Sequence, residues 1–451
     1  MEVPGRRASL HTRTAGNRGA YRRAMTDAWA LEVSKSDLSD TVLHDLDVPE
    51  PGEGEAVLRT DRVGMTANNI TYAVLGESFR YWQFFPAAEP DHGRVPLWGF
   101  AEVVASKADG VQVGQRVYGY LPTASHLVVR PERADARGFR DATPHRTALP
   151  SPYNAYALTT GDAAYEAERE DLQVLFRPLF FTSFMLADQL QDTEGVLVLS
   201  SASSKTSYGA AFLLRQAGRE VVGLTSPGNV AFTESLGCYD RVLAYDAVAE
   251  LAQVTTAYVD LAGSTPLRQA LHAHLGEAVV LDLVVGVTHQ DSAPAVRLEG
   301  ARPTMFFAPD RMRQRTEDWG REGLDERFAV AWSSFAPVVE GWVDVTVGAG
   351  PQALQAAYLE VLGGSSDPRT GHVVQLETHR SPAPRQGGRA PACRARAYEQ
   401  VSYGRAVTAS TAIALPCDRP LFWPMPRTST TCRPRGKLTR ARTTPQLVEL
   451  R

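Results

Sequence analysis

The chain has 451 residues, which is more than a single hydrophobic core usually organises. Its composition, 43% hydrophobic and 22% charged, excludes wholesale disorder. The formal net charge of −4 combines three unlike segments: residues 1–24 carry +5, residues 25–377 carry −20, and residues 378–451 carry +11. The acidic central segment argues against a nucleic-acid-binding domain, because binding phosphate groups requires a positive face.

The two basic ends do not show the patterns of a folded segment. Residues 1–24 are rich in arginine and lack the apolar run of a secretory signal, so we expect a disordered extension, with a transit-like leader as the alternative. Residues 378–451 are rich in arginine and proline and show no sustained period, which predicts a second disordered extension. A shifted reading frame would explain the same composition. We assign no function to either end.

Short strands separated by Gly and Pro turns occupy the chain up to about residue 150. A turn-rich approach at 48–54 leads into a strand at 55–62, and a polar loop holds Asn68 and Asn69. Residues 111–119 alternate like a hairpin with glycine turns. This punctuation predicts a small β-barrel.

The pattern then changes to strands that alternate with helices. A helix is expected at 164–190, a buried strand at 195–199 and a helix at 207–217. Further strands are expected at 221–224, 241–244, 257–261, 279–287 and 304–307, with helices at 230–236 and 267–275, and beyond Phe328 a strand at 343–347, a helix at 352–362 and a strand at 372–376. The alternation predicts βαβ units on a parallel sheet.

Cysteine content and hydropathy indicate where such a chain resides. Cys238 is the only cysteine in residues 25–377, which permits no internal disulfide there and suggests a reducing compartment. The most apolar run, 174–187, is shorter than the ~20 residues of a membrane span and contains Arg177 and Pro178. We therefore expect a cytoplasmic protein with no membrane span and no specific nucleic-acid partner.

The order of these parts resembles the medium-chain dehydrogenase/reductase superfamily over roughly residues 27–377. The motifs that carry the resemblance are PEPGE at 49–53, GVQVGQRV at 110–117, GVLVL at 195–199, LGCYDRVLAYD at 236–246 and GHVV at 371–374. Five further stretches are similar to an uncharacterised family of unknown function within that superfamily: SSASSKT at 200–206, VDLAG at 259–263, VGVTH at 285–289, FFAP at 306–309 and DWG at 318–320.

The resemblance implies an α/β fold of two domains. A barrel-like (GroES-like) substrate domain would comprise residues 25–155 and 311–377. A Rossmann-type doubly wound parallel sheet at 156–310 would bind the dinucleotide. The zinc-dependent relatives require Cys and His ligands, but residues 25–237 lack cysteine and residues 93–125 lack both. The resemblance is therefore to zinc-free quinone and enoyl reductases, and we expect no metal.

The stretch SSASSKTSYG at 200–209 occupies the position of the dinucleotide turn. A Rossmann fingerprint uses glycines to bring the backbone close to the pyrophosphate at a helix N-terminus, yet only Gly209 is a glycine here. The candidate cofactor residues are Ser203, Ser204, Lys205 and Thr206, whose hydroxyls and ammonium could make charge-assisted contacts instead. The alternative is an ordinary serine N-cap with a solvated lysine.

Three other places bear on the cofactor. The second strand ends without the acidic residue typical of NAD sites, which favours NADP with Thr225 and Ser226 as phosphate contacts. The basic residue common in related reductases is Asn229 here, and this stretch also fits a simple turn. Asp260, with Gly263 in the same turn, would either contact a ribose or cap that turn.

Catalytic candidates are fewer. Tyr72 and Tyr81 lie in the stretch that resembles the substrate-side loop, where a tyrosine can donate a proton to an enolate; aromatic packing is the alternative. His289 ends a parallel strand and is a candidate acid or base, unless it makes only structural hydrogen bonds. Four arginines would either attract an anionic substrate or form a solvated face: Arg311, Arg313, Arg315 and Arg321.

These features favour a zinc-independent NADP(H)-linked oxidoreductase that transfers hydride to a carbonyl or activated alkene of a small-molecule substrate. The alternative is a non-catalytic ligand-binding or interaction module with a degenerate cofactor turn. The glycine-poor turn favours the module, whereas Lys205, Thr206 and His289 favour the reductase. A homodimer is left open.

Overall fold

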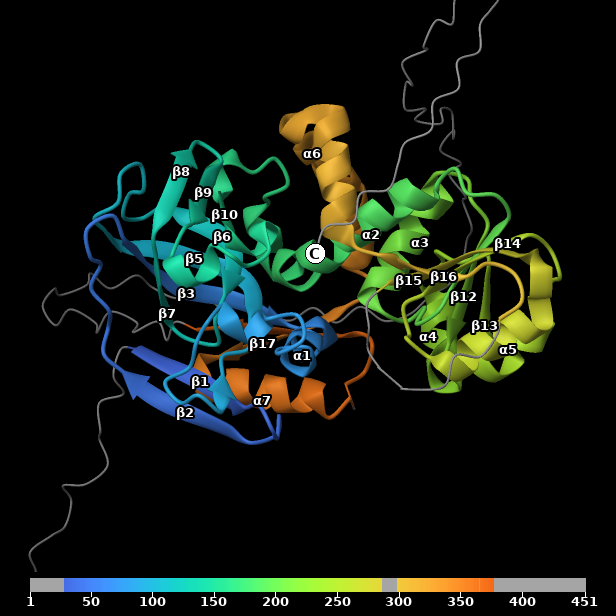
Figure 1. The fold of residues 1–451 in the computed structure, drawn as a ribbon, viewed down its shortest axis with the longest axis horizontal. Coiled ribbons are helices and arrows are strands. Elements are labelled where there is room, and N and C mark those ends of the chain that lie inside the picture. Colours follow the sequence, from blue (N-terminus) through green and yellow to red (C-terminus); the bar gives the residue numbers. More distant parts are fainter. Residues whose placement is uncertain (1–27, 286–297, 365, 377–451) are drawn as a thin grey trace, which may run out of the picture. The chain divides into compact units, whose positions relative to one another are not determined.

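The computed structural model describes residues 28–285, 298–364 and 366–376 of the chain. All of these residues belong to one compact unit. They form a mixed α/β structure, as predicted, with three β-sheets and seven α-helices among the residues described (Figure 1). None of the helices in those ranges is both long enough and apolar enough to cross a membrane.

Two of the sheets are largely antiparallel. The three-stranded sheet has the order β2-β1-β4, and the nine-stranded sheet has the order β17-β18-β3-β5-β6-β10-β9-β8, with β7 paired to β3. The strands of the first sheet are β1 (Ala28–Ser34), β2 (Thr41–Leu46) and β4 (His92–Gly93). Those of the second are β3 (Ala56–Met65), β5 (Leu97–Ser106), β6 (Arg116–Leu121), β7 (His126–Val129), β8 (Pro131–Asp135), β9 (Gly138–Asp141), β10 (Ala155–Leu158), β17 (Asp344–Ala349) and β18 (Thr370–Gln375).

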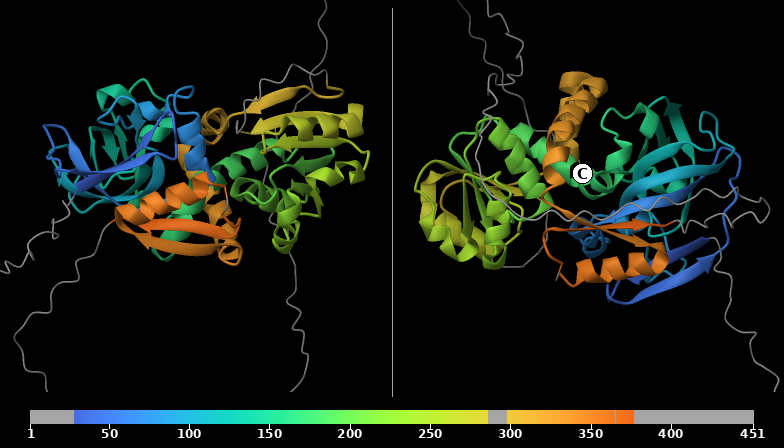
Figure 2. Two further views of the ribbon diagram at one scale, coloured as in Figure 1. Left: turned by 90° about the horizontal axis from the view of Figure 1, so that it is seen from below. Right: turned by 180° about the vertical axis from the view of Figure 1, so that it is seen from behind.

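The C-terminal strands complete the N-terminal sheet. Strand β18 pairs antiparallel with β3, so that Val373 lies opposite Gly64, and β17 pairs with β18. Figure 2 shows these two strands, in orange, beside the blue N-terminal strands. Helix α7 (Gly350–Leu362) buries Leu354 and Tyr358 in the core that these strands share. Segments more than 300 residues apart therefore build one layer, which periodicity alone does not reveal.

The third sheet is parallel throughout, with the order β13-β12-β11-β14-β15-β16. Its strands are β11 (Val196–Leu199), β12 (Val221–Thr225), β13 (Arg241–Ala244), β14 (Thr256–Asp260), β15 (Val279–Val285) and β16 (Pro303–Phe306). Their continuous apolar runs suit a sheet that is covered on both faces. Leu197 and Leu199 join one core, whereas Val198 joins another beneath α5 (Thr265–Leu275). This is the predicted doubly wound α/β arrangement.

Helix α2 (Glu170–Leu190) links the antiparallel and parallel sheets. The hydrophobic core around this helix contains Phe100 from β5 and Leu197 from β11. The core is extended by α3 (Lys205–Gln216), by α4 (Val230–Ser235) at its edge and by α6 (Ala308–Val339). The ring of Phe180 stacks on that of Phe335, with centroids 4.3 Å apart. Helix α2 therefore stabilises both sheets at once.

The structure differs from the sequence prediction at two helices. Asn68 and Asn69, expected in a polar loop, lie in α1 (Ala67–Val74), where the Asn69 side chain accepts the Thr66 N–H at 2.8 Å and donates to the Pro96 carbonyl at 2.9 Å. The polar residues that suggested a loop lie in the first turn of a helix, where Asn69 is buried. Helix α6 was not predicted at all, because its first half is strongly charged and it breaks at Gly320, where φ is 71°.

Candidate functional site

The order of the parallel strands reverses at one point, between β11 and β14. The carboxyl ends of these strands meet there, and Ser200 Oγ donates to Asp260 Oδ1 at 3.0 Å. In open parallel sheets, ligands bind in the crevice outside this switch point. A cleft of about 1190 Å³ opens there, bounded by the turn after β11, by Leu261 after β14 and by Phe306 at the end of β16.

The antiparallel strands and α1 supply the other wall of the cleft. Tyr72, Tyr81, Trp98, Tyr118 and Tyr153 form an aromatic surface on that side. His372 of β18 also lines the cleft. The antiparallel side thus contributes most of the aromatic rings, and the parallel-sheet side contributes the backbone and hydroxyl groups of the turn after β11.

The turn between β11 and α3 is held in shape without the usual glycines. Ser201 has φ of 51°, the left-handed region that a side chain rarely adopts, and its N–H donates to Tyr245 Oη at 3.1 Å. Ser204 is the N-cap of α3, and its Oγ accepts the Ser207 N–H at 3.4 Å. Gly209 is needed where α3 meets α2, because a Cβ there would lie 2.8 Å from Ser183 Oγ.

The N-terminus of α3 combines unpaired donors with a positive charge. Ser203, Lys205 and Thr206 line the cleft, and no described residue accepts a hydrogen bond from their backbone N–H groups. Lys205 Nζ donates only to the Thr370 carbonyl, at 3.1 Å, and no carboxylate pairs with it within the described ranges. Burial lowers the pKa of Lys205 to about 8. A cation is also disfavoured at a helix N-terminus, so this arrangement suits a bound anion.

Ser203 connects this turn to the end of β12. Its Oγ accepts hydrogen bonds from Thr225 Oγ1 and Asn229 Nδ2, both at 3.2 Å. Thr225 is buried, Ser226 is partly exposed, and neither lines the cleft. Thr225 is therefore linked to the cleft only by its hydrogen bond to Ser203, which lines the cleft. A phosphate contact by Thr225 or Ser226 stays a prediction.

Asp260 and Gly263 are engaged within the fold. The buried Asp260 accepts from the N–H of Gly263 at 2.9 Å and pairs with Arg268 at 2.6 Å. The carboxylate therefore caps the turn after β14, one of the two roles that the sequence allowed. Asp260 and Gly263 border the cleft through Leu261 and do not line it themselves.

The two predicted tyrosines lie together in the aromatic wall. Tyr72 Oη accepts from Asn68 Nδ2 at 2.7 Å and from Trp98 Nε1 at 3.1 Å, and no described residue accepts its own proton. Tyr81 Oη lies 3.4 Å from Tyr153 Oη. Burial raises the pKa of both phenols, which keeps them protonated at neutral pH. Tyr72 therefore has a proton to donate into the cleft, although both rings also pack tightly, as the alternative expected.

Several other lining residues were not singled out from the sequence. His289 lies outside the described residues, whereas His372 lines the cleft, with Nε2 3.4 Å from Glu360 Oε1. Arg133, Arg137 and Arg140, from the β8–β9 hairpin, line it as well. The only sequence signal for these arginines is their spacing in RADARGFR at 133–140, which is equally typical of a solvated turn.

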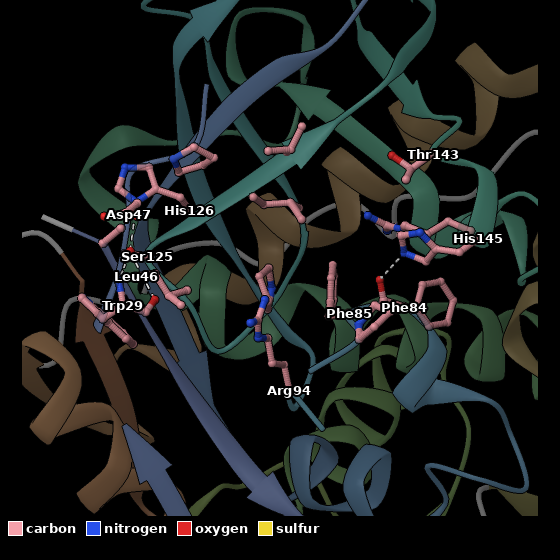
Figure 3. Close-up of a pocket in the computed structure, with 17 residues that line it drawn as sticks. Trp29, Leu46, Asp47, Phe84, Phe85, Arg94, Ser125, His126, Thr143 and His145 are labelled. Carbon is pink, nitrogen blue, oxygen red and sulfur yellow. Dashed lines mark hydrogen bonds between the residues drawn. The ribbon is translucent and has the colours of Figure 1, made fainter. Parts of the chain in front are cut away.

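A second hollow of about 370 Å³ lies in the antiparallel part, between Trp29, Phe84 and Phe85 (Figure 3). Two of its polar side chains have partners: Arg94 is held by Glu32 at 2.9 Å, and His145 Nε2 lies 3.2 Å from the Phe84 carbonyl. None of the predicted site residues lines it. Within the described ranges, no group of three or more His, Cys, Asp or Glu side chains is placed to hold a metal ion.

Comparison with known proteins supports the fold. A family model described as "Protein of unknown function (DUF2855)" matches residues 63–367. No curated protein matches the chain in sequence. The crystal structure of CurA from Vibrio vulnificus has a TM-score of 0.54 and 16% identity, covering 78% of this chain and 100% of that one. The structure of CurA in complex with NADPH, from the same organism, has a TM-score of 0.54 and 14% identity, covering 78% and 99%. At this identity the likeness shows the fold, which is the α/β fold that the resemblance implied, and the family match bears out the expected resemblance to a family of unknown function.

Proposed function

This chain belongs to the DUF2855 family of proteins of unknown function, and we propose that it is an NADP(H)-linked oxidoreductase that needs no zinc. The observation that carries the proposal is the start of α3: a lysine and three backbone N–H groups, none with an acceptor carboxylate or carbonyl among the described residues except the Thr370 carbonyl at Lys205, face a cleft at the strand switch point. Dinucleotide phosphates bind at such helix N-termini.

The residues at the turn fit a phosphate group. Lys205 and the N–H groups of Ser203 and Thr206 would hold it, with Ser204 shaping the turn. The related CurA structure contains NADPH. The end of β12 offers hydroxyls and Asn229 rather than a carboxylate, which favours NADP over NAD. Thr225 and Ser226 belong to this part of the proposed site, and Asp260 and Gly263 shape its floor.

The aromatic wall fits a small substrate with a carbonyl or an activated alkene. When bound, NADPH supplies a hydride and leaves as NADP⁺. Tyr72 would supply the proton that balances this two-electron reduction, since its hydroxyl is held by Asn68 and Trp98 with the proton free among the described residues. Tyr81 would position Tyr72, because the two ring centroids are 4.7 Å apart. His289 stays a candidate acid or base.

The proposal retains the expected domain division. Residues 156–310 would bind the cofactor, and residues 25–155 with 311–377 would bind the substrate. The cleft is lined by residues from both, such as Lys205 and Tyr72.

One observation favours the alternative, a non-catalytic module. Lys205 already donates to the Thr370 carbonyl, so its side chain serves a structural contact between α3 and β18. A lysine used only in that way would leave the turn without a cofactor role.

Titration of the full chain with NADPH and NADH by calorimetry tests the proposal. We expect NADPH to bind more tightly than NADH and Lys205→Met to weaken NADPH at least tenfold, since hydrogen bonds to charged groups contribute about 1.5–3 kcal/mol. Lys107→Met is the matched control, because Lys107 is exposed and uses only its backbone in the described hydrogen bonds. Absence of binding by either nucleotide at millimolar concentration, with the fold intact, would establish the module instead.

A further inference from the structure

We propose that the substrate of this cleft carries an anionic group, and that the arginines of the β8–β9 hairpin bind that group. We call Arg133, Arg137 and Arg140 the arginine hairpin. That the bound anion belongs to the substrate rests on the proposed function. That the hairpin binds an anion rests on the charges and contacts of the hairpin itself.

The cleft is positive within an acidic segment. Apart from His372, its basic and acidic lining comprises six basic side chains and two carboxylates: Arg133, Arg137, Arg140, Arg177, Lys205 and Arg321 against Asp135 and Asp367. Residues 25–377 as a whole carry −20. Positive lining in an acidic protein concentrates anions at that place, because low-dielectric walls focus the field.

Two members of the arginine hairpin have no carboxylate partner among the described residues. Arg133 makes no ion pair or side-chain hydrogen bond there, and Arg140 donates only to Ser151 Oγ. Arg137 lies 3.6 Å from Asp135, whose carboxylate also accepts the Arg137 and Gly138 N–H groups. Asp135 therefore serves to shape the hairpin tip and neutralises the group of three only in part.

The backbone of the hairpin is irregular at the arginines. Pairing of β8 with β9 shifts register between Glu132 and Asp135, and Arg133 has φ of 54°. A β-bulge of this kind redirects a side chain relative to a regular strand. Such local strain is retained where surrounding structure or function requires the conformation.

Other arginines near the cleft differ because acids hold them. Arg311 and Arg315 of α6 share Asp188, at 2.6 and 2.7 Å. Arg177 pairs with Asp162 and lies over the Tyr118 ring, 4.5 Å from its centroid. These side chains stabilise the fold. The arginine hairpin is the less neutralised cationic surface of the cleft. Arg321 adds to it, because its ion pair with Asp325 is long, at 3.7 Å, and exposed.

The hairpin is separate from the expected phosphate site. Figures 1 and 2 show strands β8 and β9 on one side of helix α6. The parallel sheet and α3 lie on the other side of that helix. Both the hairpin and Lys205 line the same cleft, with the aromatic wall of Tyr72, Tyr81 and Tyr153 also in it. A substrate with an apolar reactive part and an anionic end would place the first against the rings and the second at the hairpin.

Calorimetric titration of the full chain with three probes of equal chain length tests this assignment: octanoate, octyl phosphate and octan-1-ol. We expect at least one anion to bind tenfold more tightly than the alcohol, and the tighter anion identifies a carboxylate or a phosphate substrate. Arg133→Gln combined with Arg140→Gln should remove this advantage and leave alcohol binding unchanged. Arg133→Gln alone, at an exposed position, provides a milder variant should the double variant fold poorly.

The matched control is Arg313→Gln, an exposed arginine paired with Asp310 at 3.1 Å outside the cleft lining, which should change nothing. NADPH titration of the double variant separates the two proposals. Unchanged NADPH binding with lost anion binding supports the inference. Anion binding without any NADPH binding would refute the cofactor proposal and retain the anion site. Equal binding of octanoate, octyl phosphate and octan-1-ol, or loss of NADPH binding alone, would overturn the inference.

Discussion

At the scale of single residues, Lys205 depends most on its surroundings. The side chain is partly buried, its Nζ lies 5.9 Å from the centroid of the Phe176 ring, and it donates to a carbonyl rather than to a carboxylate. Removal from water disfavours the charged form, which lowers the pKa of Lys205 to about 8. Between pH 8 and the unfolded value of 10.5, the unfolded chain holds a proton that the folded chain has released. The charge therefore costs stability below pH 8, and stability rises as pH increases through this range.

The same titration predicts a pH dependence of cofactor binding. A bound phosphate requires the ammonium form, so NADPH affinity should fall about tenfold per pH unit above pH 8. Lys205→Arg keeps its charge throughout and should remove this fall between pH 8 and 9.5. Calorimetry at three pH values measures both slopes. An identical slope in wild type and Lys205→Arg would show that another group governs binding.

At the scale of elements, the contact of α2 with β3 depends on one glycine. The strand passes so close to the helix that a Cβ at Gly64 would lie 2.4 Å from the Val174 carbonyl oxygen and 2.7 Å from its carbon. Both atoms belong to backbone, which cannot rotate aside. Any side chain at residue 64 must therefore push α2 away from the antiparallel sheet.

We expect Gly64→Ala to lower the free energy of unfolding by about 1–3 kcal/mol, the usual cost of overpacking. Gly228→Ala is the control, since a Cβ there meets nothing within 4 Å. Urea unfolding followed by circular dichroism measures both. A Gly64→Ala protein as stable as the control would mean that the strand and helix separate at little cost.

At the scale of the whole molecule, α2 joins the two kinds of sheet into one core. Phe180 is fully buried, stacks on Phe335 and lies in the cluster that also contains Phe100 and Leu197. Two sheets that share a core are expected to unfold together rather than as independent domains.

Phe180→Ala should therefore destabilise both sheets to the same extent, by about 3–5 kcal/mol in total. Hydrogen exchange at β5 and β11 provides separate readings of the antiparallel and parallel sheets. We expect protection to fall equally in both. A loss confined to β11 would show that the cofactor part unfolds by itself, as a loosely attached domain would.

The sequence by itself determined the strands and helices of the parallel sheet, whereas the strand order and its switch point come from the structure. Strand β13 matches its predicted bounds at Arg241–Ala244, and β11 and α5 differ from prediction by one or two residues at their ends. These elements have apolar periods that are local properties of the chain, so the pattern is readable without the partner. The same pattern placed Ser203–Thr206 after a first strand, which is why the cofactor turn could be proposed from the sequence.

The tertiary structure decided what those residues face. The sequence left Lys205 as either an anion contact or a solvated side chain, and only the packing of α3 against β18 shows it partly buried and without a carboxylate among the described residues. It left Tyr72 as a ring in a loop, whereas the structure shows its oxygen accepting from Asn68 and Trp98. The charge of −20 on residues 25–377 gave no sign that the cleft is lined by arginines. Burial, hydrogen-bond partners and local charge arise from segments far apart in the chain, so periodicity and composition do not contain them.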